Sequence, residues 1–175
     1  MIGYAIELLF DTKSENKIFE LVETLKKHKI KNKFLEVKSK PHIALSVFDK
    51  IDENEVINLI KNIEIKKMKI SMNGIGTFHG KENTIYLIPK ATTELLNFQK
   101  SLHKQLLSYS NCWDYYYPEN WIPHCTVAMN VADDKFLNAF KLIRENFSPI
   151  NATIKKINLI KFHPVEILYE KEISI

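Results

Sequence analysis

The chain has 175 residues, of which 45% are apolar, and its 25 basic and 21 acidic side chains give a formal net charge of +4. This length allows a single compact domain or two small fused lobes with a proper core. The basic residues are mixed with acidic ones, so the charge suits an anionic ligand without indicating a long nucleic-acid duplex.

The sequence is typical of a protein of the cytoplasm. No apolar run approaches the ~20 residues that span a bilayer, and Glu7 interrupts the N-terminal apolar run, which argues against a signal peptide. The two cysteines, Cys112 and Cys125, show no repeated spacing, which favours a reducing compartment over a disulfide framework. We therefore expect a soluble, cytoplasmic protein that makes no contact with a membrane.

Strand and helix patterns alternate twice along the chain. The first half is expected to contain a strand at 2–10, a helix capped by Ser14, a Lys-rich connection at 26–40, a strand from Pro41, a helix at 53–62 and a strand at 66–78. The second half is expected to contain a strand at 84–89, a helix from Thr92 or Thr93, a tyrosine-rich loop at 115–117, a strand from Pro123, a helix from Asp133 or Asp134, and strands at 150–162 and 165–173.

The order of these elements indicates an internal duplication, with halves at approximately 1–82 and 83–175. The interval from Ile2 to His42 equals the interval from Thr84 to His124, so each histidine stands at the same place relative to the first strand of its half. Equivalent strands of a duplicated unit are related by a pseudo-twofold axis, and Gly/Ser linkers are absent between the halves. We predict one bilobal domain over 1–175, in which two histidines face each other across a central cleft.

Each histidine opens a short strand-like run after a proline: Pro41-His42-Ile43-Ala44-Leu45 and Pro123-His124-Cys125-Thr126-Val127. Side chains alternate faces along a strand, so His42 shares a face with Ala44, and His124 shares one with Thr126. Cys125 then faces away from the histidine and is expected to be a core residue rather than a nucleophile.

Two opposed histidines suit in-line displacement at phosphorus. A neutral imidazole can take the proton of the attacking water or hydroxyl, while an imidazolium on the far side gives a proton to the leaving oxygen. The Thr126 hydroxyl can donate to a non-bridging phosphate oxygen, and this scheme requires neither a metal nor a cofactor.

These two motifs resemble the His-x-Thr/Ser-x pair of the 2H phosphoesterase superfamily, which includes the 2'-5' RNA ligase and RNA cyclic phosphodiesterase proteins. The resemblance implies an α+β fold with two pseudo-symmetric lobes of antiparallel sheet and flanking helices around a central cleft. It also implies metal-independent action on 2',3'-cyclic phosphates or 2'-5' linkages, with His42 and His124 as the acid/base pair and Thr126 as a phosphate ligand.

The first motif departs from the family pattern because Ala44 stands where that pattern has Thr or Ser. The loss of one preorganised donor can lower a rate ~100-fold or more. A backbone amide, a water or a lysine can replace this donor, or catalysis is weakened. Lys40, which precedes the motif, is either an electrostatic helper or a solvated surface lysine.

Aromatic residues near the second motif are further candidates for substrate contacts. Tyr115, Tyr116, Tyr117 and Trp121 form either a lid or base-stacking platform, or a group that packs the loop down. Phe78 and Phe162 each precede a histidine, His79 and His163, for which a turn role or a place on the cleft rim is open. His28 and His103 are expected to be exposed on helices with structural roles.

Three functions remain open. The first is an enzyme that opens or forms phosphodiester bonds at a ribose 2' position of an RNA terminus or small nucleotide, acting as a monomer. The second is a catalytically weakened module that binds a nucleotide or an RNA end. The third is a structural histidine pair or an adventitious metal site, although two histidines fall short of a zinc ligand set.

Overall fold

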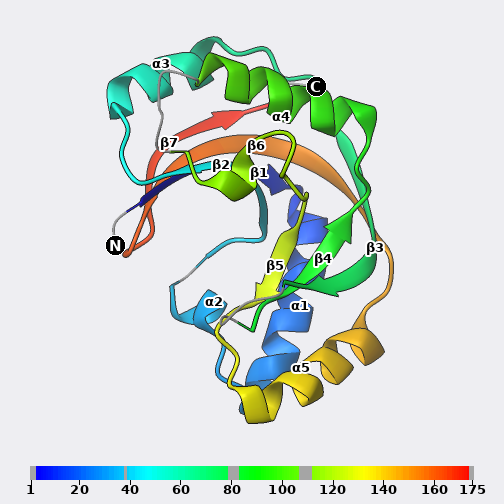
Figure 1. Ribbon diagram of the computed structural model, residues 1–175. Helices are drawn as coiled ribbons and strands as arrows, with labels where there is room; N and C mark the ends of the chain where they lie inside the picture. The colour runs from blue at the N-terminus through cyan, green and yellow to red at the C-terminus, as the bar shows by residue number, and fades with distance from the viewer. Residues whose placement is uncertain (1–2, 38, 79–82, 107–111, 174–175) are drawn as a thin grey trace.

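The computed structural model describes residues 3–37, 39–78, 83–106 and 112–173. These ranges contain helices and strands in the predicted order, together with a short helix α2 that was not predicted (Figure 1). The elements are β1 (Gly3–Phe10), α1 (Thr12–Lys27), α2 (Lys33–Glu36), β2 (His42–Phe48), α3 (Glu53–Asn62), β3 (Lys69–Thr77), β4 (Ile85–Pro89), α4 (Thr93–Gln105), the 3-10 helix η1 (Asp114–Tyr116), β5 (Cys125–Ala128), α5 (Asp133–Asn146), β6 (Ile150–Phe162) and β7 (Glu166–Glu172).

The strands form one antiparallel sheet in the order β2-β1-β6-β3-β4-β5, with β7 added to β6. Exchanging β1 with β4, β2 with β5 and β3 with β6 reverses this order onto itself. The interval from the first residue of β1 to His42 equals that from the first residue of β4 to His124. The α+β class and the pseudo-symmetric antiparallel sheet are therefore confirmed.

Helices from one half of the chain pack against strands of the other half. Helix α1 packs against β5 and α5, whereas α4 packs against β2. Figure 1 shows α3 and α4 on the side of β7, and α1 and α5 on the opposite side of the molecule. We call these sides the β1–β2 lobe (β1, β2, β7, α3, α4) and the β4–β5 lobe (β3, β4, β5, α1, α5); the long strand β6 runs through both.

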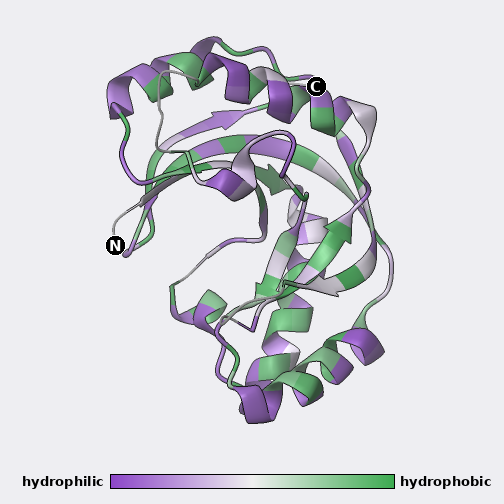
Figure 2. Ribbon diagram, viewed as in Figure 1, coloured by the Kyte–Doolittle hydropathy of each residue, from purple (hydrophilic) through white to green (hydrophobic). Residues whose placement is uncertain are grey.

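Alternation along β1 separates two buried clusters. Ile6, Leu8 and Phe10 face the main core, in which the helices pack on the sheet. Ala5 faces the other side and joins Ala44, Val47 and Ile160 in a smaller cluster under Tyr116, Phe162 and Val165. The helices that cover the sheet carry both hydrophobic and hydrophilic residues, as Figure 2 shows. The side of β1 that bears Glu7 is therefore the one that carries the smaller cluster.

The first helix begins with a cap that differs from the prediction. Asp11, not Ser14, is the N-cap of α1, and its carboxylate accepts hydrogen bonds from the Ser14 backbone N–H (3.0 Å) and hydroxyl (2.9 Å). The same carboxylate accepts from Thr153 N on β6 at 2.7 Å. A carboxylate can accept several bonds at once, so Asp11 ties the helix start to the sheet. Thr92 is the N-cap of α4, which was predicted to begin at Thr92 or Thr93.

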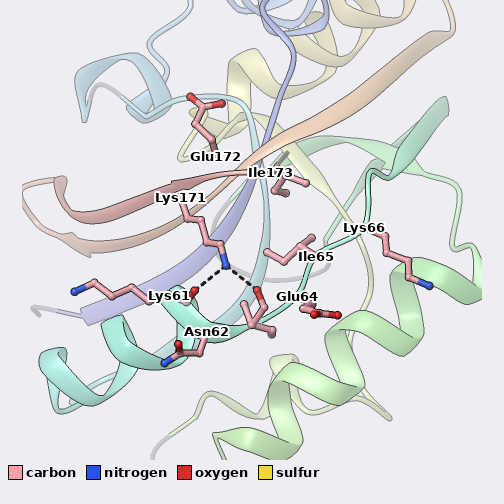
Figure 3. A pocket seen from close by; sticks show the side chains of 9 residues that line it. Lys61, Asn62, Glu64, Ile65, Lys66, Lys171, Glu172 and Ile173 are labelled. Carbon is pink, nitrogen blue, oxygen red and sulfur yellow. Dashed lines mark hydrogen bonds between the residues drawn. The ribbon is translucent and has the colours of Figure 1, made fainter. Parts of the chain in front are cut away.

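A lysine joins the C-terminal end of α3 to the last strand. Lys171 Nζ of β7 donates to the carbonyls of Ile60, Lys61 and Ile63 at 3.2, 2.9 and 2.7 Å. The last two of these bonds are drawn in Figure 3. These carbonyls have no partner inside the helix, so a cation placed there stabilises the helix end. The surface pocket drawn in Figure 3 lies beside this contact and is lined by neither His42 nor His124.

Candidate active site

His42 is the first residue of β2, and both of its ring nitrogens face oxygen atoms. Nδ1 lies 2.7 Å from the Lys40 carbonyl oxygen, and Nε2 lies 3.3 Å from Oε1 of Glu7 on the neighbouring strand β1. The Glu7 side chain is 7% exposed and the His42 side chain 19%. Burial raises the pKa of Glu7, and the charge of a protonated His42 opposes that rise.

His124 directly precedes β5 and lies among aromatic rings. Its Nδ1 is 2.7 Å from the Ile122 carbonyl oxygen. Its ring stands edge-on to Phe78 and Tyr86, with centroid distances of 4.8 and 5.7 Å. Burial lowers the pKa of His124; the bond to Ile122 opposes this effect, and the charge of His42 adds to it. His124 is therefore biased toward its neutral form.

The two histidines are oriented in the same way. In each, Nδ1 lies 2.7 Å from the carbonyl oxygen two residues earlier in the chain. A carbonyl oxygen only accepts, so each Nδ1 carries the hydrogen and each Nε2 is left for other partners. This shared arrangement matches two imidazoles that exchange protons through Nε2.

The structure brings the two motifs together. Strands β2 and β5 are the two ends of the sheet path, yet they contact each other. The Cys125 thiol is buried and faces the core as predicted. Burial raises its pKa to about 12, although the His42 backbone N–H acts in the opposite direction. Cys125 therefore packs β5 against the start of β2 and is a poor nucleophile.

The residues two positions beyond the histidines lie in different surroundings. Thr126 is half-buried and pairs with Tyr86 of β4. Ala44 pairs with Glu7 of β1, is 5% exposed and packs in the smaller cluster with Tyr116. The two motifs thus occupy equivalent places in the sheet but present different chemical groups.

The loop aromatics divide into exposed and packed side chains. Tyr115 is 79% exposed, whereas Tyr117 packs edge-on against His103 at 4.8 Å. Trp121 is buried, and its indole N–H donates to the Ala44 carbonyl at 3.0 Å. Phe78 stacks on Tyr86 at 4.3 Å, beside His124. Of the aromatics that the sequence suggested for substrate contacts, Phe78 is the one that lies against a motif histidine.

Lys40 contributes to the site through its backbone carbonyl group. Its side chain is exposed, and its carbonyl oxygen holds His42 Nδ1. An electrostatic role for the Lys40 ammonium group stays a prediction.

Amide side chains hold the outer edges of the two motif strands. Gln99 of α4 donates to the Leu45 carbonyl at 3.1 Å. In the other lobe, Asn32 donates to the Val127 carbonyl at 2.8 Å and accepts from Met129 N at 3.1 Å. These bonds satisfy edge groups that would otherwise be open, and they fix the strands that carry His42 and Thr126.

Glu7 and Tyr86, which lie against the histidines, and Trp113, which lies beside Phe162, were given no site role from the sequence. Glu7 is an acid inside an otherwise apolar strand, and this pattern is the signal that could have indicated it. Tyr86 and Trp113 carried no comparable signal, because their positions follow from strand register and loop packing. Trp113 is 39% exposed and stands edge-on to Phe162 at 6.1 Å.

The other histidines lie outside this group. His103 was expected to be exposed, but it is 6% exposed because its ring packs under Tyr117. His28 is the exposed C-cap of α1, and His163 follows Phe162 in a turn with a φ of 68°. His79 lies outside the described residues.

Neither a metal site nor a membrane-spanning helix is found among the described residues. In the described ranges, no three His, Cys, Asp or Glu side chains come together as a metal site would require. None of the helices in the part of the chain that the structure covers combines the length and hydropathy needed to cross a bilayer.

Similarity to known proteins extends over most of the chain. The family model of the 2'-5' RNA ligase superfamily matches residues 15–166. A Bacillus licheniformis protein with the provisional name phosphoesterase is 21% identical over 126 residues, covering 69% of this chain and 70% of that protein. The crystal structure of a phosphoesterase superposes with a TM-score of 0.63 at 9% identity, covering 100% of both chains. Escherichia coli LigT complexed with 3'-AMP superposes with a TM-score of 0.61 at 10% identity, covering 99% of both chains. The two superpositions show a shared fold.

Proposed function

The chain belongs to the 2'-5' RNA ligase superfamily, and from that membership we propose that it is a metal-independent 2H phosphoesterase. Its proposed substrates are the 2',3'-cyclic phosphates or 2'-5' phosphodiester linkages of RNA ends or small nucleotides. Superfamily membership supports the general class of activity, that of a phosphoesterase-type enzyme. The proposed mechanism rests on the histidine pair.

One observation carries this proposal: two histidines at equivalent positions in the sheet hold their Nδ1 atoms on the carbonyl two residues earlier, at 2.7 Å in both cases. Packing alone does not require the same bond twice. Acid/base catalysis does, because both rings must present Nε2 in a defined orientation.

The surroundings of the rings suggest their roles. His124 has a lowered pKa because of its burial, so it accepts the proton of the attacking water or hydroxyl while the new O–P bond forms. His42 then donates a proton to the leaving oxygen as the old P–O bond breaks. The half-buried Thr126 hydroxyl donates to a non-bridging phosphate oxygen and steadies the phosphorus between the rings.

Aromatic side chains on both lobes suit a nucleotide substrate. Phe78 and Tyr86 are stacked beside His124 in one lobe. Trp113 and Phe162 form an edge-on pair in the other lobe, and Trp113 is 39% exposed. Stacking on such rings stabilises a bound base by ~1 to 3 kcal/mol. The LigT structure with 3'-AMP shows a nucleotide bound to a protein of this fold, and we propose the same ligand class here.

We propose that the protein acts as a monomer in the cytoplasm, with 1–175 forming one bilobal domain.

The second candidate function is a weakened module that binds a nucleotide or an RNA end, and Ala44 favours it because the first motif then lacks one phosphate donor.

The test is hydrolysis of nucleoside 2',3'-cyclic phosphates in excess EDTA by the wild-type chain and by the variants His42→Ala and His124→Ala. We expect turnover in the wild type and a loss of ~100-fold or more in each variant. His28→Ala is the control, because His28 is exposed at the end of α1. Binding of 3'-AMP without turnover would support the second candidate function instead.

A further inference from the structure

Glu7 is a buried carboxylate inside β1, and it lies against His42. Its Oε1 is 3.3 Å from His42 Nε2, and its side chain is 7% exposed. The strand register places Glu7 opposite Ala44, on the face of the sheet that carries His42. Because Ala44 is small, the space beside the histidine is left to the carboxylate.

The contact between these two atoms requires a proton. Nδ1 of His42 carries a hydrogen because the Lys40 carbonyl can only accept. A neutral ring would therefore turn the Nε2 lone pair toward the Glu7 carboxylate, and two acceptors repel each other. One proton must lie between the two groups. The 3.3 Å separation exceeds the ~2.7–2.9 Å of a charge-assisted hydrogen bond, so a proton on Nε2 would keep room for a second acceptor.

The equivalent place in the other lobe is occupied by an uncharged ring. Tyr86 pairs with Thr126 as Glu7 pairs with Ala44, and its ring faces His124. The two histidines thus have the same backbone bond and different neighbours. A carboxylate neighbour favours a protonated imidazole, whereas aromatic burial favours a neutral one.

Building on the proposed function, we propose that Glu7 is a positioning residue that holds, through His42, the proton that the leaving oxygen of the substrate receives. His42 passes this proton from Nε2 to the leaving oxygen as the P–O bond breaks. Glu7 stays a carboxylate during this step, and a proton from solvent then restores the pair.

Other titratable groups face the pair from neighbouring elements. The half-buried Tyr116 of η1 lies near enough to Glu7 that, after desolvation, the carboxylate charge is the next cause of its raised pKa. The charge of His42 also lowers the pKa of His124, after the larger effect of burial. On β6 and β7, Lys156 pairs with Glu170 and Glu172, so its charge is already balanced.

The first experiment detects the proton on His42 Nε2 directly and does not depend on enzymatic activity. The 15N chemical shift of His42 Nε2, assigned with a His42→Asn variant, distinguishes a protonated nitrogen from one with a free lone pair. Near pH 7 we expect a protonated signal in the wild type and its loss in Glu7→Gln, which keeps the shape and removes the charge. Glu53→Gln is the matched control, because Glu53 accepts from Tyr4 on the other face of β1. An unchanged His42 signal in Glu7→Gln would overturn the proposal, whatever the enzyme hydrolyses.

The second experiment compares two leaving groups. For a nucleoside 2',3'-cyclic phosphate, whose leaving alkoxide needs a proton, we expect Glu7→Gln to lower kcat/KM about 100-fold. A nitrophenyl phosphodiester releases a stable phenolate, so its kcat/KM should be nearly unchanged. Equal losses on both substrates would assign Glu7 a merely structural role and overturn the proposal. If the wild type turned over neither substrate, the proposed function would fail, and the nitrogen shift would still decide the role of Glu7.

Discussion

The β1–β2 and β4–β5 lobes each carry an equivalent strand pair, a histidine and the same kind of Nδ1 hydrogen bond. The side chains beside the two histidines differ. In the β1–β2 lobe, Glu7 and Ala44 accompany His42 beneath Tyr116. In the β4–β5 lobe, Tyr86 and Thr126 accompany His124 beside Phe78. A symmetric backbone can therefore support an asymmetric reaction, because an acid and a base need opposite environments.

The largest effect that separates the lobes concerns the hydroxyl of the second motif. Thr126→Val keeps the shape of the side chain and removes the donor, so we expect kcat/KM to fall about 100-fold. Ala44→Ser adds the corresponding hydroxyl in the other lobe, but Ala44 is 5% exposed under Tyr116, so we expect no gain. Steady-state kinetics on a cyclic nucleotide would check both changes, and a large gain from Ala44→Ser would show that the two half-sites act alike.

The N-caps of α1 and α4 offer a comparison of stability. Asp11→Ala removes an N-cap that also accepts from Thr153 N on β6, so we expect it to lower the free energy of unfolding by about 2 kcal/mol. Thr92→Ala removes a cap with one such bond, at 3.2 Å, and should lower it by about 1 kcal/mol. Urea denaturation would measure both values, and equal losses would count against the extra tie to β6.

The Asp11 contribution also depends on pH. Burial alone would raise the pKa of Asp11, but the N–H groups of Thr153 and Ser14 and the Ser14 hydroxyl outweigh it and lower the pKa. A carboxyl with a lowered folded pKa stabilises the fold above its unfolded pKa, and this contribution disappears as the pH falls through the folded value. The gap between wild type and Asp11→Ala should therefore narrow in acid.

A glycine on β3 provides a test specific to the β4–β5 lobe. A Cβ at Gly76 would lie 2.6 Å from the Tyr86 ring, so Gly76→Ala must displace the ring that faces His124. We expect kcat/KM to fall about tenfold, which corresponds to a loss of about 1.4 kcal/mol in transition-state stabilisation. Gly74→Ala is the control, since its Cβ would meet the flexible end of Ile88 at 3.2 Å. Similar losses in both variants would argue against a role for the Tyr86 ring.

The smallest expected effect is the pH dependence of the stability change at Glu7. Because burial raises the folded pKa of Glu7, the folded Glu7–His42 pair holds its shared proton to higher pH than the Glu7 carboxyl of the unfolded chain does. Stability from this group is thus present below the unfolded pKa and is lost as the pH rises through the folded value. Relative to wild type, Glu7→Gln should gain stability as the pH rises through the folded pKa of Glu7, measured by urea denaturation. A loss of stability relative to wild type as the pH rises would contradict the burial of this carboxyl group.

The sequence was sufficient for the order of strands and helices and for the two motifs. Periodicity is a local property, so α3 was predicted at 53–62 and is observed at those residues. Alternation placed Cys125 in the core and Thr126 on the side of His124 before any register was known. The repeated spacing between the first strand of each half and its histidine indicated the duplication.

Contacts between distant segments were decided only by tertiary structure. Glu7 meets His42 because β1 pairs with β2 in one particular register, and a shift by one residue would turn the carboxylate to the opposite face. His103 is buried by a loop that follows its own helix, and Asp11 binds a strand far along the chain. Local patterns in this chain thus determined which groups were available for chemistry. The long-range pairing of strands, which no local pattern encodes, decided which histidine has a carboxylate beside it and which lies among aromatic rings.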